Sequence, residues 1–215
     1  IRQTIFKNTL WLVSAEVATR FLEIILIIYV TRILGPTEFG RFAFVLAFVS
    51  VFAMFSDFGL ATITTRELAQ DKEVEKEYSN ILSLKIMLSA IALILMIIGS
   101  FFITADPVIR KLVWILSLYA LVDHFFFIIF AFLRARQQMQ YEALIKMVQT
   151  ILIVVIGFFV IFAFPSIMNV GYGYLVANVI ALGLMLLFVH FYLFYLRLGF
   201  NRALLFKFLR FSWPV

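Results

Sequence analysis

Six long apolar runs, separated by short polar segments, divide the chain. They cover residues 10–34, 39–63, 81–103, 108–133, 143–164 and 167–196. Because a membrane-spanning helix needs about 20 mostly apolar residues, each run predicts one such helix. The predicted fold class is therefore an all-α polytopic membrane protein with a six-helix transmembrane lobe over residues 1–196. The last run is long enough to tilt, or to break near Gly171 and Gly173.

The seam between the first two runs is too short for a loop. It reads TRILGPTEFG over residues 31–40. Gly35 is suited to the left-handed backbone that closes a helix, and Pro36 is well placed in the first turn of the next one. The seam therefore predicts a tight turn between two membrane helices.

Two polar segments have a different character from the runs. Residues 64–80 carry mixed charges, which favour a solvated helix extension over a regulatory or partner-binding arm. Residues 197–210 have the pattern of a basic amphipathic helix that lies along the inner membrane surface. Residues 211–215 resemble the start of a seventh helix, so we expect the chain to be part of a longer protein.

Composition supports a membrane protein. Hydrophobic residues make up 65% of the chain, charged residues 14%, and the mean hydropathy is +1.09, which is more apolar than a soluble domain. There is no cysteine, which excludes a disulfide framework and a thiolate metal site. The net charge of +6 comes mostly from residues that flank apolar runs, so it reports membrane topology and not a nucleic-acid partner.

The positive charges also predict an orientation. If the N-terminus is cytoplasmic, thirteen of the 18 Lys and Arg residues lie on the inner side and Arg20 lies within the first run. The outer side then holds Arg32, Arg41, Arg110 and Lys111. Since inner loops carry the excess of Lys and Arg, we expect the N-terminus to be cytoplasmic.

Three ionisable residues share the first run. Glu16, Arg20 and Glu23 are four and three positions apart, which places them on one face of a helix. Charged side chains inside a bilayer cost about 2.5–3.5 kcal/mol each on insertion scales, so this face must meet a partner or a cavity. It is either a self-satisfied ion pair that fixes helix packing or a polar strip that lines a transport path.

Asp123 lies about as deep in the fourth run as Arg20 does in the first. We therefore expect the two side chains to face each other across a cavity. The neighbouring His124 points elsewhere and is either a buried histidine or a proton relay. In the sixth run, Asn178 either makes an interhelical hydrogen bond or binds substrate.

Asp57 lies near the inner end of the second run, two residues before Gly59. It has three possible roles: to cap a helix break, to pair with Arg66, or to bind a coupling cation. The spacing alone leaves all three open.

The sequence does not favour an enzyme. Its two histidines, His124 and His190, lie far apart in sequence. It has no Gly-rich phosphate loop and no His-Glu-x-x-His spacing for a metal. We therefore expect no catalysis, no cofactor and no metal site.

Several motifs resemble a known family. They are RILGPTEFG (32–40), DFGL (57–60), RELA (66–69), RARQQM (134–139) and FSWP (211–214). Together they resemble the Wzx-type polysaccharide flippases, which belong to the MOP superfamily with the lipid II flippases and the MATE exporters. The resemblance implies a V-shaped, two-lobed transporter of the cytoplasmic membrane, of which this chain would be the N-terminal lobe.

The resemblance also implies a function, namely movement of oligosaccharides linked to a polyprenyl (pyro)phosphate from the inner to the outer leaflet by alternating access. Arg20 would contact the headgroup in a cationic cavity, with Glu16, Glu23 and Asp123 as tuning partners. The segment from Arg32 through Gly35 and Pro36 to Gly40 would be the outer hinge. Implied partners are the glycan lipid, membrane lipids, the C-terminal lobe and a glycan polymerase, with no nucleic acid.

Two positions separate the chain from the lipid II flippases. Those proteins carry further cations where this chain has Leu26 and Met54, which favours a polysaccharide repeat unit over lipid II as substrate. Two other functions stay open. They are a cation-coupled drug exporter, for which an acid-dominated cavity would be the sign, and a non-transporting scaffold for glycan assembly.

Overall fold

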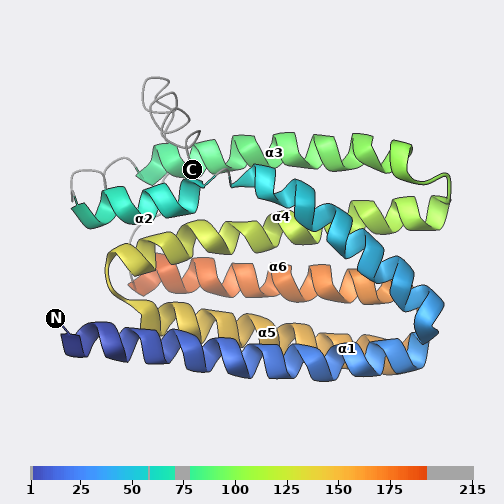
Figure 1. Ribbon diagram of the computed structural model, residues 1–215, viewed down its shortest axis with the longest axis horizontal. Helices are drawn as coiled ribbons and strands as arrows, with labels where there is room; N and C mark the ends of the chain where they lie inside the picture. Colours follow the sequence, from blue (N-terminus) through green and yellow to red (C-terminus); the bar gives the residue numbers. More distant parts are fainter. Residues whose placement is uncertain (1, 58, 71–77, 193–215) are drawn as a thin grey trace.

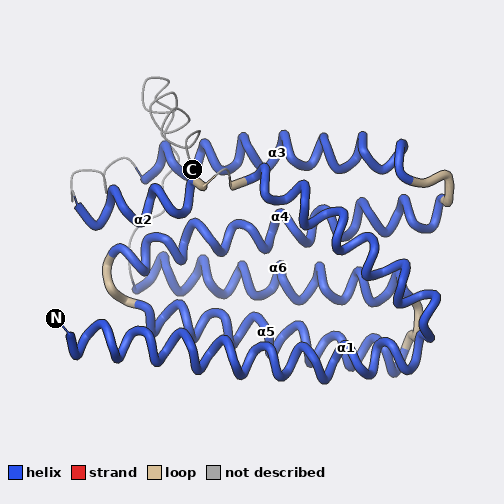
Figure 2. The backbone as a smooth tube through the Cα atoms, viewed as in Figure 1, coloured by secondary structure: helices blue, strands red, loops and turns tan. Residues whose placement is uncertain are grey.

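The computed structural model describes residues 2–57, 59–70 and 78–192, and this part of the chain contains helices and no strand (Figures 1 and 2). The all-α prediction is confirmed. The elements are α1 (Arg2–Ala53), a 3-10 turn (Met54–Ser56), α2 (Leu60–Gln70), α3 (Tyr78–Ile103), α4 (Pro107–Ala135), α5 (Met139–Ala163) and α6 (Ile167–Tyr192).

Helix α1 contains two arms that meet at Gly35, where the chain reverses (Figure 1). The backbone of Gly35 has φ 81° and ψ 166°, and Pro36 follows as the first residue of the second arm. Because that combination of angles is essentially restricted to glycine, Gly35 permits the reversal. The tight turn predicted from the sequence is confirmed.

The second apolar run is not one helix to residue 63, as its hydropathy predicts. Helix α1 ends at Ala53, a 3-10 turn follows, and Gly59 adopts φ 74° before α2 begins. The Asp57 carboxylate accepts a hydrogen bond from the Ala61 amide at 3.4 Å and so caps the new helix. Asp57 therefore lies at a helix break.

Within the described part of the chain, five helices are long and apolar enough to cross a membrane, and the first candidate span alone covers 48 residues, Thr9–Ser56. At 1.5 Å per residue, a 48-residue helix is about 72 Å long, so each of its arms is long enough to cross a hydrocarbon core of about 30 Å. The chain is thus a multi-pass membrane protein. The other spans are Ile81–Ile103, Pro107–Ala135, Met139–Ala163 and Ile167–Phe191.

Helix α6 does not break at its glycines. It is continuous from Ile167 to Tyr192, and a Cβ on Gly171 would lie 2.9 Å from the Leu112 side chain of α4. A Cβ on Gly173 would lie 3.2 Å from Val160 of α5. The glycines therefore allow close helix packing and not a kink.

Helix α4 lies at the centre of the bundle. In the most apolar 18-residue stretch of α4, 61% of the residues are buried, compared with 28–33% in the corresponding stretches of the other candidate spans. It contacts every other described α-helix, whereas the first arm of α1 runs beside α5 at one edge and α3 lies at the opposite edge (Figure 1). One buried cluster surrounds Leu26, Val45 and Leu116, and a second surrounds Leu84 and Ile129.

The helix ends alternate between two sides of the bundle. The N-terminus and the α4–α5 connection lie at one end, and the Gly35 turn, the α3–α4 connection and the α5–α6 connection lie at the other (Figure 2). This arrangement fits the predicted topology. The predicted interfacial helix 197–210 and the helix start 211–215 lie outside the described residues.

Candidate functional site

A cavity of about 540 Å³ opens between both arms of α1, α4, α5 and one residue of α6. This volume lies within the range of small-molecule pockets in proteins, about 300–1,000 Å³. Most of the side chains that line the cavity are charged or aromatic. The charged ones are Arg20, Glu23, Asp123, Arg134, Glu142 and Lys146, and the aromatic ones are Phe39, Phe42, Tyr119, Phe126, Phe127, Phe130 and Tyr174.

The charged strip of α1 forms one connected network. Arg20 donates to Glu16 at 2.9 Å and to Glu23 at 3.0 Å, which confirms that the three residues share a face. Lys146 of α5 forms an ion pair with the second oxygen of Glu16. The Arg20 side chain is still 66% exposed, so the strip faces an open space and not a packed interior.

Asp123 and Arg20 both line the cavity across which the sequence predicts them to face each other, and no ion pair joins them among the described contacts. Asp123 Oδ1 accepts a hydrogen bond from Gln149 of α5 at 2.8 Å and a long one from Asn178 of α6 at 3.5 Å. Arg20 is held by the two glutamates of its own helix, which lie one turn away on either side. Each of the two side chains is therefore held by other partners.

Asn178 is fully buried and joins three helices. Its oxygen accepts from Gln149 at 2.7 Å, and its nitrogen donates to the Tyr119 carbonyl of α4 at 3.3 Å. The interhelical hydrogen bond expected for Asn178 is confirmed. The other role expected for Asn178 is to bind substrate. Asn178 is fully buried and does not line the cavity, whereas its partner Gln149 does, so a ligand in the cavity would meet Gln149 and not Asn178.

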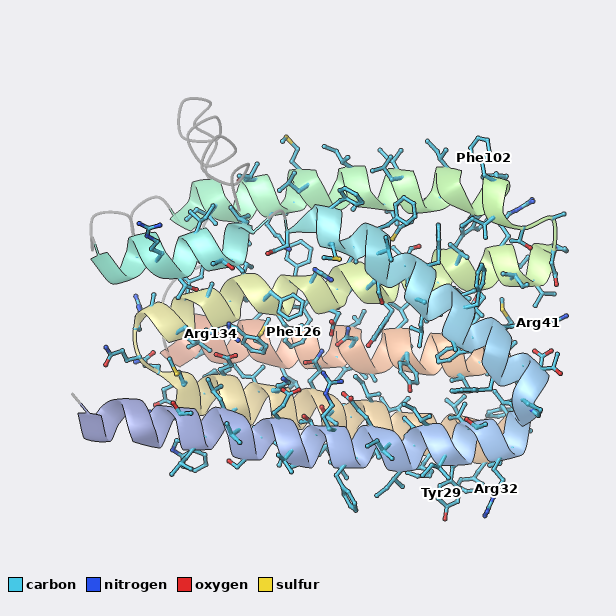
Figure 3. All side chains as sticks on the ribbon, viewed as in Figure 1. Tyr29, Arg32, Arg41, Phe102, Phe126 and Arg134 are labelled. Carbon is cyan, nitrogen blue, oxygen red and sulfur yellow. The ribbon has the colours of Figure 1, made fainter. Side chains whose placement is uncertain are left out.

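Sequence reasoning missed two of the cavity cations, Arg134 and Lys146, which it assigned to the inner flanks of helices. Arg134 at the end of α4 donates to Glu142 of α5 at 2.8 Å, and Glu142 is only 3% exposed. Figure 3 shows Arg134 toward the N-terminal end of the bundle. The signal was available, because Glu142, Lys146 and Gln149 repeat the spacing of the α1 strip.

Asp57 lies away from the cavity lining. Its partner is Lys85 of α3, whose Nζ lies 3.0 Å from Asp57 Oδ1 and 3.0 Å from the Ser56 carbonyl. The Lys85 side chain is completely buried. Of the roles open to Asp57, the cap is observed, and the ion pair forms with Lys85 instead of Arg66.

His124 packs edge-on against Phe127, with ring centroids 5.0 Å apart. Its Nδ1 atom is buried and has no hydrogen-bond partner in the described part of the chain. This environment agrees with a buried histidine.

The expected hinge residues lie at the opposite end of the bundle from Arg134 (Figure 3). Arg32 is exposed, and Gly40 is helical with open space around it. Next to the turn, Arg41 pairs with Glu38 at 2.8 Å and reaches Asp106, the cap of α4, at 3.9 Å. These contacts fasten the turn to α4, and whether the segment acts as a hinge stays a prediction.

The cavity lining contains three cations and three carboxylates, and the cations come from three different helices. Within residues 2–57, 59–70 and 78–192, no group of three His, Cys, Asp or Glu side chains is arranged to hold a metal ion. The paired cations offer charge-assisted hydrogen bonds to an anion. The aromatic rings offer apolar faces to the rest of a ligand.

Comparisons with known proteins agree with this architecture. A family model described as "Polysaccharide biosynthesis protein" matches residues 5–215. No curated protein sequence matches the chain significantly.

Two solved structures share the fold at 19% sequence identity. One is a MOP superfamily transporter from Pyrococcus furiosus, for which a reversed polarity of the binding pocket is said to suggest a different function, with a TM-score of 0.76. The other is a multidrug resistance MATE family transporter of the MOP superfamily in an outward-facing conformation, with a TM-score of 0.72. Each comparison covers 98% of this chain and 51% of the solved chain, so this chain spans about half the length of these transporters.

Proposed function

Because the chain belongs to the polysaccharide biosynthesis protein family, we propose that it is one lobe of a flippase for lipid-linked oligosaccharides. The complete protein would move polyprenyl-(pyro)phosphate-linked repeat units across the cytoplasmic membrane by alternating access. The C-terminal lobe would supply the other half of the substrate path. The length of the chain relative to the MOP transporters supports this division into lobes.

The observation that carries the proposal is the cavity in which three cations from three helices lie among aromatic rings. A glycan lipid has a phosphate group, which needs cations, and sugar rings, whose C–H faces pack on aromatic side chains. The cavity offers both kinds of surface within one space. A purely structural bundle has no need for six charged residues around an open volume, given the cost of placing each in a membrane.

Arg20 is the cation best placed to meet the headgroup. It is 66% exposed, compared with 46% for Arg134 and 36% for Lys146. Its carboxylate partners are themselves 42% and 37% exposed. Because exposed ion pairs are worth only about 0–1 kcal/mol, a phosphate can displace these carboxylates at little cost.

The charge of the cavity lining weighs against a cation-coupled drug exporter. An exporter of cationic drugs would be expected to have a cavity dominated by acidic groups, whereas this lining has three cations and three carboxylates. The charge of the cavity does not test the non-transporting scaffold, because a scaffold would bind no substrate there. A transport assay is needed for that alternative.

The test is a translocation assay with the full-length protein in liposomes and a fluorescent oligosaccharide on polyprenyl pyrophosphate. We expect Arg20→Ala to slow flipping by about 10- to 100-fold, the range for one charge-assisted hydrogen bond of about 1.5–3 kcal/mol. Lys111→Ala is the matched control, because Lys111 is an exposed cation outside the cavity. It should flip at the wild-type rate.

Three outcomes have different meanings. Flipping that Arg20→Ala slows and Lys111→Ala preserves supports the flippase. Equal flipping by all three proteins would remove Arg20 from the substrate path. A correctly inserted wild-type protein that moves no glycan lipid would refute the flippase and favour the exporter or the scaffold.

A further inference from the structure

Four oxygen atoms on the cavity lining have no hydrogen-bond partner within the described part of the chain. They are Asp123 Oδ2, Gln149 Oε1 and the hydroxyls of Tyr119 and Tyr174. All four residues line the cavity. Since the four residues come from α4, α5 and α6, the oxygens form a group that three helices hold in place.

The group is held in one orientation by a buried network. Gln149 uses both amide hydrogens, one toward Asp123 Oδ1 at 2.8 Å and one toward Asn178 Oδ1 at 2.7 Å. Asn178 is fully buried and is anchored by the Tyr119 carbonyl. The amide of Gln149 therefore presents its oxygen as a free acceptor, and the carboxylate of Asp123 presents its second oxygen.

Asp123 also differs from the other carboxylates that line the cavity. Glu23 pairs with Arg20, and Glu142 pairs with Arg134. Among the described residues, Asp123 has only neutral partners. An unpaired carboxylate beside an amide oxygen attracts hydrogen-bond donors and repels phosphate, so this surface is unsuited to the headgroup itself.

The surroundings suit a sugar ring. The Tyr119 and Tyr174 rings lie edge to face with centroids 5.7 Å apart, and Phe42 lies 5.5 Å from Tyr174. Their faces and edges can pack against the C–H groups of a pyranose. At the same place, the free oxygens can accept hydrogen bonds from its hydroxyls.

The position relative to the cations also fits a glycan lipid. On α5, Gln149 lies three residues from Lys146, which is about 4.5 Å along the helix axis. A phosphate held by Lys146 and Arg20 would therefore place the next group of the substrate beside Gln149 and Asp123. In a glycan lipid, that group is the first sugar.

We propose that Asp123 and Gln149, with Tyr119 and Tyr174, form a subsite that recognises the sugar ring next to the carrier phosphate. The ligand is a polyhydroxylated hexose that donates hydroxyl hydrogens to Asp123 Oδ2 and Gln149 Oε1. The inference rests on the proposed function and adds to it the residues that set the sugar preference.

The experiment compares two kinds of substrate in liposomes with the full-length protein. One is undecaprenyl pyrophosphate without sugar, and the other is a series of the same lipid with single monosaccharides that differ at one hydroxyl. Wild type should move at least one of the glycosylated lipids about 10-fold faster than the bare lipid. Asp123→Asn should reduce this preference by about 10- to 100-fold, the loss expected for hydrogen bonds to a charged group. Any change that it causes in the rates of both lipids cancels from this ratio.

Two further variants make the test specific. Gln149→Met, which removes the second acceptor and keeps the length of the side chain, should also reduce the preference. Arg20→Ala should slow both kinds of lipid by the same factor, because it acts on the shared phosphate. A monodisperse elution profile in detergent and wild-type insertion into liposomes show that Asp123→Asn still folds.

Several results would overturn the subsite. The first is an equal loss of rate on both lipids in Asp123→Asn. The second is a wild type that moves no glycosylated lipid faster than the bare lipid. The third is a sodium dependence of transport, on both lipids, that disappears in Asp123→Asn, because Asp123 would then bind a coupling cation and not a sugar. If wild type moves neither lipid, the proposed function fails, and equilibrium binding to the solubilised full-length protein decides the subsite separately. Tighter wild-type binding of a glycosylated lipid, lost in Asp123→Asn, supports the subsite, and equal binding overturns it.

Discussion

Removal of Asp57 should destabilise the protein more than removal of Lys85, although either change breaks the same ion pair. The two partners differ in burial. The Lys85 side chain is 0% exposed, whereas the Asp57 side chain is 20% exposed. The effect of each substitution therefore depends on the group that it leaves behind.

The magnitudes follow from the geometry. At 3.0 Å and an effective dielectric constant of about 20, the direct attraction is about 5 kcal/mol, which sets an upper bound. Asp57→Ala leaves a buried ammonium group with only the Ser56 carbonyl, and loss of one partner of a buried pair costs about 3–5 kcal/mol. Lys85→Met leaves a carboxylate that reaches water and keeps the Ala61 amide, so its cost should be about 1–3 kcal/mol.

The double variant Asp57→Ala/Lys85→Met provides the sharpest check. Since it leaves no unpaired charge, its cost should be well below the sum of the single costs, because replacement of both partners is often close to neutral. The measurement is the free energy of unfolding of the full-length protein in detergent, determined by denaturant titration. The exposed pair of Glu38 and Arg41 is the control, and Glu38→Ala should cost less than about 1 kcal/mol.

Two results would refute this reasoning. One is a larger cost for Lys85→Met than for Asp57→Ala, which would mean that burial of the remaining charge does not control stability. The other is a double variant whose cost equals the sum of the single costs, which would mean that the two residues are not coupled.

Other substitutions test the turn, the packing and a second cavity cation, Arg134, by the same unfolding measurement. Gly35→Ala should cost about 1–3 kcal/mol because its backbone angles are essentially restricted to glycine, whereas Gly40→Ala, in a helix with open space, should gain up to about 1 kcal/mol. Gly157→Leu should cost about 1–3 kcal/mol, since a Cβ there already meets a leucine of α1 at 2.9 Å. Gly183→Leu, with nothing within 4 Å, should show no loss. Arg134→Ala should cost about 3–5 kcal/mol because it leaves a buried glutamate unpaired, and a cost below 1 kcal/mol would show that water reaches that glutamate.

The features that the sequence predicts correctly are those that depend on residues close together in the sequence. Gly35 followed by Pro36 marks a turn because both residues restrict the backbone locally. Glu16, Arg20 and Glu23 share a face because helix geometry fixes residues three and four positions apart. For the same reason, hydropathy locates each of the candidate membrane spans found among the described residues.

The errors arise where distant residues decide the structure. The helix break at Asp57 lies inside an apolar run and is one of three possibilities that the spacing leaves open, whereas the ion pair of Asp57 joins it to a lysine on another helix that no local pattern indicates. Lys146 lies near the end of an apolar run, so from the sequence it is counted among the positive charges that set the membrane orientation. Its ion-pair partner, Glu16, is 130 positions away, and no local pattern indicates the pair. Asp123 is held by two amides of other helices, and no local pattern reports the helix packing that brings them to it.

The cavity cations are not equivalent under the proposed function, and the difference lies in their partners. Arg134 is joined to a carboxylate that is 3% exposed, so a phosphate that took its place would leave Glu142 buried without a cation. Arg20 is joined to two half-exposed carboxylates that water can solvate after displacement. Because an exchange at Arg20 costs about 0–1 kcal/mol and one at Arg134 several kcal/mol, the headgroup should bind first at Arg20. Arg134 then acts mainly to hold α4 against α5, which keeps the cavity lining in place while the ligand changes its contacts.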